Sequence, residues 1–369
     1  MSICTEHNFP LIQYKAGASH YDWGLEHGKQ FKAGIHELYQ IRKELMLARN
    51  PSLRKHLSSL AQEQWEKTKE FSPEISQELQ GIADGSELDI EAITILNNYT
   101  DFRDIQLPEE GCSTIHVQRG QLALSGQTWD MHRSAKNYLC IIHVPEHDNS
   151  PEILVLSLVG CTGLMAMSAD GRVIGVNNIN TENAKAGIIW PALVRQTLAG
   201  KNLSEMASIL KNAPVTSGHN YIISTHEGGQ HWEVTPTASE CVGEVQEGSH
   251  AESFHTNHCL GESITPLEMK TSLNSTTHQR FELLTRKAPK VKNFEHLYSL
   301  LTDHEEYPKS ICSHFESGAQ DPSFTCGGGI IEISQSIQAK FWRGCPHAGE
   351  DYKDYDFLSD GKKWTLKNR

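Results

Sequence analysis

The stretch from Gly111 to Met131 reads GCSTIHVQRGQLALSGQTWDM, and it marks the place where the pattern of the chain changes. Upstream of it, apolar residues recur with the helical period of about 3.6 residues, whereas within it they alternate with period two. We therefore predict strands at residues 113–117 and 122–131, joined by a turn at Arg119-Gly120. Cys112 then stands at the start of an antiparallel hairpin, directly after a glycine.

Downstream of this hairpin, further short strands are expected, interleaved with pairs of helices. The predicted strands are residues 139–144, 153–159, 165–168, 173–177, 221–224, 232–234, 330–333 and 339–342, and the predicted helices are 190–198, 204–210, 278–286 and 294–301. This order lacks the regular strand-helix alternation of a parallel sheet, and it indicates a layered α+β sandwich.

The first hundred residues predict helices. Ser72-Pro73 supplies an N-cap and a proline at the first helical position, and the helix that follows is expected to end at Gly85. Asp89 is predicted to cap a shorter helix. The change from helix period to strand period falls at residues 108–111, which is the best candidate for a joint because no repeat or low-complexity linker occurs elsewhere.

The composition is that of a folded soluble protein. The chain has 369 residues, of which 38% are hydrophobic and 21% charged, so it can build a substantial core. No stretch approaches the roughly 20 apolar residues that a membrane span needs. Residues 1–11 carry Glu6, His7 and Asn8 where a signal peptide would need apolar residues, so we expect no membrane partner and a cytoplasmic protein.

The charge and the cysteines exclude further classes. The formal net charge is -13, from 46 acidic and 33 basic residues, and a chain of this charge repels nucleic acid. The nine cysteines form no paired framework and no Cys-x-x-Cys motif, so we expect thiols in a reducing compartment. One of these thiols could still have a catalytic role.

The Gly111-Cys112 dipeptide suits self-cleavage. A thiol can attack the carbonyl that precedes it and shift the chain onto sulfur as a thioester, which water then opens, and glycine tolerates the strained backbone that this requires. Cleavage would leave Cys112 with a free α-amino group, whose ordinary pKa of roughly 7.7 to 8.0 allows it to accept the proton of its own thiol. Taken alone, the dipeptide fits a buried structural cysteine better.

Other segments support the catalytic interpretation. Residues 111–115 (GCSTI) are followed by GQTWD at 126–130, and far downstream by FHTNH at 254–258 and YPKSIC at 307–312. In order and spacing these segments resemble the penicillin acyltransferase family, the autoproteolytic cysteine family typified by isopenicillin N acyltransferase, within the N-terminal-nucleophile hydrolases. Residues 17–28 look like the opening helix of that family, so the resemblance covers nearly the whole chain.

The resemblance implies a four-layer αββα sandwich of two antiparallel sheets flanked by helices. It also implies a precursor that is cut before Cys112. Residues 1–111 would form a helical small chain and residues 112–369 the catalytic chain, and the two would remain together as a heterodimer and one domain.

Site residues follow from the same resemblance. Cys112 takes the place of the nucleophile, with Gly111 and Thr114 at positions near the bond to be cut. Asp130 falls on the acidic position of the next strand, where a carboxylate could orient the new ammonium group, and Asn257 falls on the polar position expected to donate to an oxyanion. The candidates for substrate-lining residues are Trp129, His132, His255 and His314.

The sequence departs from the family pattern at positions where the penicillin-type members carry arginine. Ser310-Ile311-Cys312 is followed here by Ser313-His314, and no arginine occurs between Arg286 and Arg343. An acceptor held by its carboxylate would lose its partner, so a β-lactam acceptor is in doubt. The net charge favours an amine-bearing, cationic acceptor or leaving group, and Lys309 or His314 could compensate for the missing arginines.

We therefore expect an autoproteolytic enzyme that acts on a non-peptide amide or an acyl thioester through a thioester on Cys112, by hydrolysis or by transfer to an amine. No cofactor is expected, and acyl-CoA is a candidate substrate. One alternative is a strict amidohydrolase of the bile-salt or penicillin V type, although those relatives begin at the cysteine. Another is a catalytically silent scaffold of the same fold.

A metal-dependent hydrolase is the most remote alternative. His132, His255 and His258 could be interpreted as part of a metal site. No short-spaced ligand set such as His-Glu-x-x-His occurs, however, and no Cys-x-x-Cys motif supports a thiolate zinc site, so no metal is expected.

Overall fold

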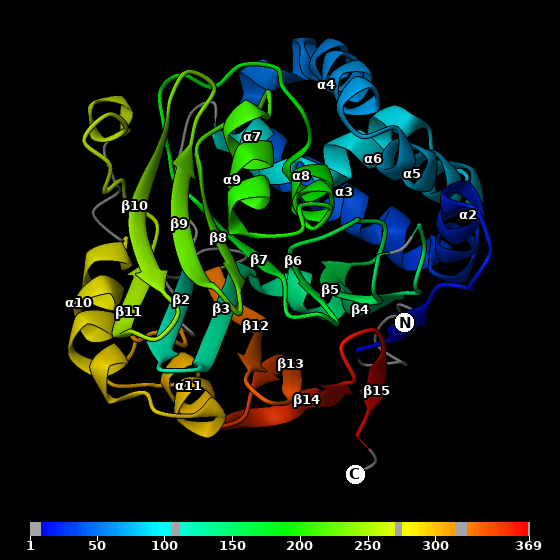
Figure 1. The fold of residues 1–369 in the computed structure, drawn as a ribbon. Coiled ribbons are helices and arrows are strands. Elements are labelled where there is room, and N and C mark those ends of the chain that lie inside the picture. The colour runs from blue at the N-terminus through cyan, green and yellow to red at the C-terminus, as the bar shows by residue number, and fades with distance from the viewer. Residues whose placement is uncertain (1–8, 105–110, 149, 270–274, 314–322, 368–369) are drawn as a thin grey trace.

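The computed structural model describes residues 9–104, 111–148, 150–269, 275–313 and 323–367. The predicted hairpin is present as β2 (Cys112–Arg119) and β3 (Leu122–His132), with Cys112 opposite Trp129. This hairpin lies in a seven-stranded sheet that packs on an eight-stranded sheet (Figure 1). The α+β prediction with two stacked sheets is confirmed.

The eight-stranded sheet has the order β1-β4-β5-β6-β7-β8-β9-β10. Its strands are β1 (Leu11–Gln13), β4 (Leu139–Val144), β5 (Ile153–Leu158), β6 (Met165–Ser168), β7 (Val173–Asn178), β8 (His219–Thr225), β9 (Gly228–Val234) and β10 (Ser239–Gln246). Neighbours are antiparallel except β1, which pairs with β4 in parallel. The two predicted antiparallel sheets thus contain one parallel pair, at this edge. A long helical segment separates β1 from β4, so no hairpin dictates their relative direction.

The seven-stranded sheet has the order β11-β2-β3-β12-β13-β14-β15. Its remaining strands are β11 (His250–His255), β12 (Ser323–Ile333), β13 (Ile337–Cys345), β14 (Ala348–Ser359) and β15 (Trp364–Leu366). Strand β11 at one edge and β12 in the centre lie on either side of the β2–β3 hairpin. The hairpin is thus held from both sides, by strands that are distant in the sequence.

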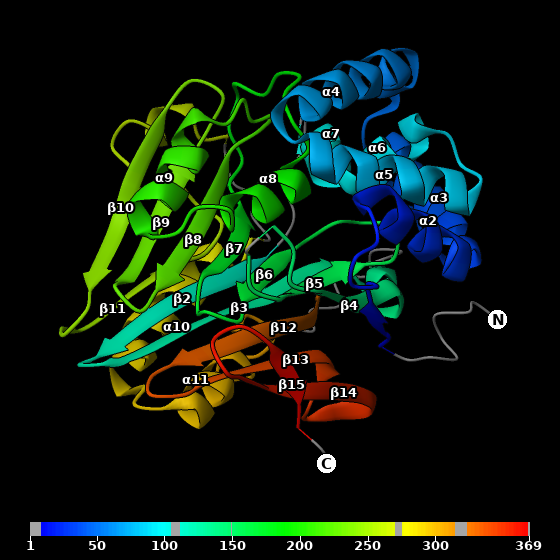
Figure 2. The same ribbon diagram turned by 45° about the vertical axis from the view of Figure 1, so that its right-hand side comes forward.

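Helices cover both outer faces of the sandwich (Figures 1 and 2). On one side lie α2 (His20–Gln30), α3 (Lys32–Arg49), α4 (Leu57–Phe71), α5 (Pro73–Ser86), α6 (Ile90–Asn97), α7 (Tyr99–Asp104), α8 (Trp190–Thr197) and α9 (Leu203–Asn212). On the other lie α10 (Thr277–Lys287) and α11 (Phe294–Leu301). Short 3-10 helices occur at Pro51–Lys55, Arg133–Tyr138, Thr265–Leu267 and Ala288–Lys290.

Two apolar cores hold these layers together. The larger one joins the N-terminal helices, α8 and α9 to the eight-stranded sheet and continues into the seven-stranded sheet. The smaller one lies under α10 and α11 and includes Ile115, Leu124, Leu284, Leu297 and Trp342. Helix α10 is therefore fixed directly over the β2–β3 hairpin.

The strands and helices predicted between residues 112 and 345 are confirmed with shifts of a few residues at their ends. Strands β1, β10, β11, β14 and β15 are missing from the prediction. Strand β10 is largely exposed and β14 is rich in acidic residues, so neither shows a clear apolar alternation. Asp89 caps α6 as predicted, and its side chain accepts a hydrogen bond from the amide of Ala92 at 2.7 Å.

Other predictions concern the membrane and the thiols. Among the described residues, no helix is long and apolar enough to cross a membrane. No disulfide joins the eight described cysteines to one another, as the sequence predicts.

Glycines set the closest helix contact of the N-terminal layer. A Cβ added at Gly24 in α2 would lie 1.9 Å from the carbonyl oxygen of Glu78 in α5, and one added at Gly81 would lie 2.1 Å from that of Tyr21. The two backbones therefore touch directly. This also explains why Gly85, the expected end of α5, lies inside the helix: it packs against α2, and Glu87 takes the left-handed position at the helix end instead.

We predict that Gly24→Ala destabilises the protein by about 1–3 kcal/mol, because the methyl group would overlap the backbone of α5 and force the helices apart. Urea unfolding followed by circular dichroism measures this. Gly163→Ala is the matched control, since the nearest atom to its Cβ would be 3.4 Å away, an ordinary contact. Equal stability of the two variants would contradict the close packing of α2 on α5.

Candidate active site

Cys112 is buried at the first position of β2, where the sequence predicts the start of a strand. It is 6% exposed, and its Sγ lies 4.0 Å from the carbonyl oxygen of Asp130 on the neighbouring strand. Its backbone N–H donates a hydrogen bond of 2.8 Å to Oδ1 of Asn257. The nucleophile candidate, the acidic candidate and the polar candidate are thus brought together, although Cys112 and Asn257 are 145 residues apart in the sequence.

The space beside Cys112 is too small for a side chain at position 111, so only glycine fits there. A Cβ at position 111 would lie 2.9 Å from Oδ2 of Asp130 and 3.1 Å from Nη2 of Arg280. A carboxylate and a guanidinium therefore both lie against the Gly111-Cys112 peptide. Glycine here leaves room for these two charged groups at the bond that the sequence predicts to be cut.

Arg280 is the site residue that the sequence analysis missed. It lies in α10 and is 1% exposed. Its Nη1 donates to the carbonyl oxygen of Cys112 at 2.6 Å and to Oγ of Ser113 at 3.0 Å, and its Nη2 donates to Oδ1 of Asn257 at 2.7 Å. Burial lowers the pKa of Arg280, while the charges of Asp130 and Cys112 raise it. Arginine nevertheless keeps its proton in proteins, so it brings a fixed positive charge to the site.

A signal for Arg280 was present in the sequence. The buried face of α10 consists of Thr277, Arg280, Leu283 and Leu284, so a charged residue stands on the apolar stripe of an amphipathic helix. Such a residue is almost never fully buried unless it has partners. The family resemblance points to arginines after the Ser310-Ile311-Cys312 segment, whereas Arg280 precedes it.

Asn257 is held in one orientation by its neighbours. Its Oδ1 accepts from both Cys112 and Arg280, and its Nδ2 donates to the carbonyl oxygen of Asn178 at 2.8 Å. Because both donors face the oxygen, the amide oxygen and not the amide nitrogen points at Cys112. The donor nitrogen Nδ2 is directed toward Asn178 instead, so the oxyanion role of Asn257 stays a prediction.

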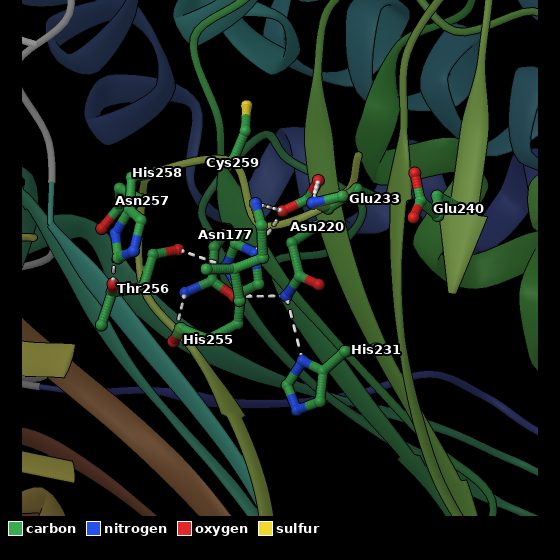
Figure 3. Close-up of polar contacts among 12 residues, drawn as sticks. Asn177, Asn220, His231, Glu233, Glu240, His255, Thr256, Asn257, His258 and Cys259 are labelled. Atoms are coloured by element: carbon green, nitrogen blue, oxygen red, sulfur yellow. Dashed lines mark hydrogen bonds and ion pairs between the residues drawn. The ribbon is translucent and has the colours of Figure 1, made fainter. Parts of the chain in front are cut away.

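The loop that carries Asn257 is anchored by a buried pair of a histidine and a carboxylate. Nε2 of His255 lies 2.7 Å from Oε1 of Glu233, and both side chains are 0% exposed (Figure 3). Glu233 also accepts from the amides of Leu260 and Gly261 at 2.6 and 3.0 Å. Both ring nitrogens of His255 have partners, because Nδ1 bonds to the carbonyl oxygen of Thr256. The structure thus places His255 in the support behind the site rather than on its lining.

Thr277, at the start of α10, fixes the other end of this arrangement. Its Oγ1 accepts from the backbone N–H of Asn257 at 2.7 Å and bonds to Nδ1 of His258 at 2.9 Å. Burial, together with the charges of His278, His255 and Arg280, lowers the pKa of His258 to about 3, so this ring is neutral. The position of Asn257 is therefore set by Glu233 on one side and by α10 on the other.

Thr114 connects the site to the facing sheet. Its hydroxyl donates to Oδ1 of Asn177 on β7 at 2.6 Å, and Nδ2 of Asn220 on β8 donates to the same oxygen at 2.9 Å. Asn220 continues to His231, as Figure 3 shows. Thr114 lies on the same face of β2 as Cys112. Its hydroxyl is directed at the facing sheet and not at the Gly111-Cys112 bond, so Thr114 helps to align the two sheets.

The remaining candidates have separate positions. Trp129 is buried opposite Cys112 in β3, and His132 lies at the end of β3, where Nδ1 bonds to Ser134 at 2.7 Å and the ring packs edge-on against Tyr99. His314 lies outside the described residues. Among those residues, His132, His255 and His258 do not form a common ligand group, and the group that could hold a metal is elsewhere.

A curated relative matches most of the chain. A sequence relative from Emericella nidulans, the 40 kDa form of acyl-coenzyme A:6-aminopenicillanic-acid-acyltransferase, is 24% identical over 304 residues, which cover 80% of this chain and 82% of that protein.

Two similar solved structures are more distant. The Caenorhabditis elegans orthologue of N-acylethanolamine-hydrolyzing acid amidase is 12% identical, with a TM-score of 0.40, and the match covers 60% of this chain and 92% of that one. A variant of conjugated bile acid hydrolase from Clostridium perfringens is 12% identical, with a TM-score of 0.41, and the match covers 70% of this chain and 97% of that one.

The family model described as acyl-coenzyme A:6-aminopenicillanic acid acyl-transferase matches residues 117–321, a range that includes Asp130, Asn257 and Arg280. Since this range is more than half of the chain, the protein belongs to the acyl-coenzyme A:6-aminopenicillanic acid acyl-transferase family.

Proposed function

We propose that the protein is a self-cleaving cysteine enzyme that transfers or hydrolyses acyl groups through a thioester on Cys112. The observation that supports this most directly is the convergence of three buried groups on one peptide bond. Asn257 accepts from the nitrogen of that bond, Arg280 donates to the carbonyl oxygen that follows it, and Asp130 lies against Gly111. A structural cysteine has no need of such surroundings.

In the proposed self-cleavage, the thiol of Cys112 loses its proton and attacks the carbonyl carbon of Gly111. The carbon–nitrogen bond breaks, the nitrogen of Cys112 takes up a proton, and the chain is held by a carbon–sulfur bond. Water then adds to this thioester, which releases the carboxylate of Gly111 and regenerates the thiol. Asp130 would orient the attacking water or the new ammonium group, as its place against Gly111 allows.

In turnover, the free amine of Cys112 would accept the proton of its own thiol. Asn257 would hold this amine beside the sulfur through the same contact that it makes to the amide N–H. The thiolate attacks the acyl carbonyl of an amide or thioester substrate, the leaving group departs with a proton, and the acyl group remains on sulfur. Water or an amine then takes the acyl group, so hydrolysis and transfer share every step but the last.

We expect a neutral or cationic amine as the acceptor or leaving group. The guanidinium of Arg280 is engaged by Cys112, Ser113 and Asn257, and Arg343 donates to the carbonyl oxygen of Lys136 and to Asn137. Neither arginine is therefore available to bind the carboxylate of an acidic acceptor. Together with the net charge of -13, this supports amines such as polyamines or amino-acid amides over amino acids with a free carboxylate.

We also propose that the cleaved chains, residues 1–111 and 112–369, stay together as a heterodimer. The larger core contains residues of both, among them Ile35 and Leu38 from the first and Leu156 and Val194 from the second. Strand β1 would remain paired with β4 after cleavage. The eight described cysteines form no disulfide with one another, which fits a reducing compartment, and we keep the cytoplasm as the proposed location.

The function is tested by following products with a substrate panel under matched conditions. Wild-type protein is incubated with N-acyl amines, with N-acyl amino acids, and with acyl-CoA plus an amine, and the free acid and the new amide are measured by mass spectrometry. We expect faster turnover of N-acyl amines than of N-acyl amino acids, and an acyl adduct on Cys112. The ratio of acid to amide separates hydrolysis from transfer.

Cys112→Ala should abolish this activity, whereas the control variant Cys259→Ala, which removes another buried thiol, should retain it. Activity in the Cys112→Ala protein would contradict the proposed nucleophile. Faster turnover of the acidic substrates would contradict the proposed amine partner.

We predict that Arg280→Lys lowers turnover by about 100-fold or more, because an ammonium cannot reproduce the donors that a planar guanidinium directs at Cys112 and Asn257. Arg286→Lys is the matched control on the same helix, since Arg286 is half-exposed and pairs with Glu305 and Glu306. Initial rates and melting temperatures are measured for both variants. An Arg280→Lys protein that is folded and fully active would show that the guanidinium is dispensable.

A further inference from the structure

A second cluster of reactive side chains lies outside the catalytic site. The ligand atoms of His304, Cys312 and Cys345 all lie within 4.8 Å of one another. Nε2 of His304 is 3.3 Å from Sγ of Cys345. The two cysteines are buried and His304 is half-buried, so the cluster is reached from the side of the histidine.

Three segments of the chain meet at this cluster. His304 follows α11, and Cys312 lies in the turn beyond it, where its backbone N–H donates to the carbonyl oxygen of Asp303 at 3.0 Å. Cys345 ends β13 and opens the short turn into β14. Helix α11 lies beside this hairpin (Figures 1 and 2), and the ring of Tyr298 packs edge-on against Trp342.

We propose that His304, Cys312 and Cys345 bind a structural zinc ion. Zinc takes thiolate and imidazole ligands in tetrahedral geometry, at about 2.3 Å for sulfur and about 2.0–2.1 Å for nitrogen, so ligand atoms around one ion lie roughly 3.5 Å apart. The cluster has the right donor atoms: Nε2 of His304 and Sγ of Cys345 are 3.3 Å apart, and all three ligand atoms lie within 4.8 Å of one another. Water, or the exposed His347 whose ring lies 5.5 Å from that of His304, would complete the site.

The surroundings of Cys345 suit a metal-bound thiolate. The backbone N–H of His347, two residues further on, donates to Sγ of Cys345 at 3.3 Å. Hydrogen bonds of this kind orient a ligand sulfur and stabilise its negative charge. The turn at Pro346 therefore presents the sulfur of Cys345 toward His304 and Cys312 in a fixed direction.

Charge balance favours a divalent ion. On binding Zn²⁺, cysteine ligands release their protons to solvent, and two thiolates then neutralise the two charges of the ion. The buried site gains no net charge.

Such an ion would hold one wall of the catalytic site in place. Ser313, next to Cys312, exchanges two hydrogen bonds of 2.7 Å with Thr325 on β12. Thr325 lies opposite Asp130 in the sheet register. The zinc would tie the turn at residues 304–312 to the β13–β14 hairpin and, through Ser313, to the strand beside Asp130.

The test measures metal content on the full-length protein, prepared with reductant in zinc-supplemented medium and dialysed against metal-free buffer. We expect about one zinc per chain for the wild type and less than ~0.1 for Cys345→Ala. The control variant Cys161→Ala, which replaces a buried cysteine of the other layer, should also bind about one zinc per chain. Reloading stripped wild type with zinc should raise its melting temperature by several degrees, and this rise should be absent in Cys345→Ala.

Cobalt binding provides a second readout. A second variant, His304→Ala, controls for misfolding of Cys345→Ala. Co²⁺ loading of the wild type should give the thiolate-to-cobalt charge-transfer band of a tetrahedral site, and the band should be lost in Cys345→Ala and also in His304→Ala, where the altered side chain is half-exposed. The proposal would be overturned if the wild type contained no more zinc than Cys345→Ala. It would also be overturned if Cys312 and Cys345 formed a disulfide and the reduced protein took up no metal. Neither readout depends on catalysis, so this failure is distinguishable from failure of the proposed function.

Discussion

The buried guanidinium of Arg280 is the interaction on which the site depends. It joins the first strand of the hairpin, through Cys112 and Ser113, to the loop that carries Asn257 and to its own helix through Thr276. A buried charge costs several kcal/mol unless it is paired and hydrogen-bonded. The carboxylate of Asp130 and the acceptors around Gly111-Cys112 supply that compensation, so the groups that surround the proposed cleavage site are also the groups that keep the arginine buried.

Behind this contact, the two sheets meet through polar side chains as well as apolar ones. Thr114, Asn177, Asn220 and His231 form a continuous hydrogen-bonded path between β2 and the facing sheet. Because a buried polar group without a partner is costly, such a path favours one relative placement of the sheets over neighbouring ones. The contact of Glu233 with His255 holds the loop of Asn257 to the same facing sheet, and Cys112 and Asn257 are thereby positioned by contacts from both sheets.

Much of this arrangement could be predicted from the sequence because the relevant signals are local. The period change at Cys112 predicts the hairpin, and the glycine before it predicts room at the scissile bond. The family resemblance, rather than a local signal, implies the roles of Asp130 and Asn257. Arg280 could not be placed in the same way, because it is 168 residues from Cys112 in the sequence and only the fold brings them together. Strands β10 and β14 depend on neighbours for their pairing, since their own residues are mostly polar. His255 looks like a lining residue because it lies two positions before Asn257, yet its partner Glu233 belongs to a strand of the other sheet.

The most direct measurement is the intact mass of the purified protein under denaturing conditions, taken for the wild type and for Cys112→Ala side by side. If Cys112 attacks its own preceding peptide bond, the wild type gives two species that divide between Gly111 and Cys112, and the variant gives one full-length chain. A single uncut chain in both proteins would contradict self-cleavage. Cleavage of the variant at the same bond would show that another group, and not the Cys112 thiol, performs it.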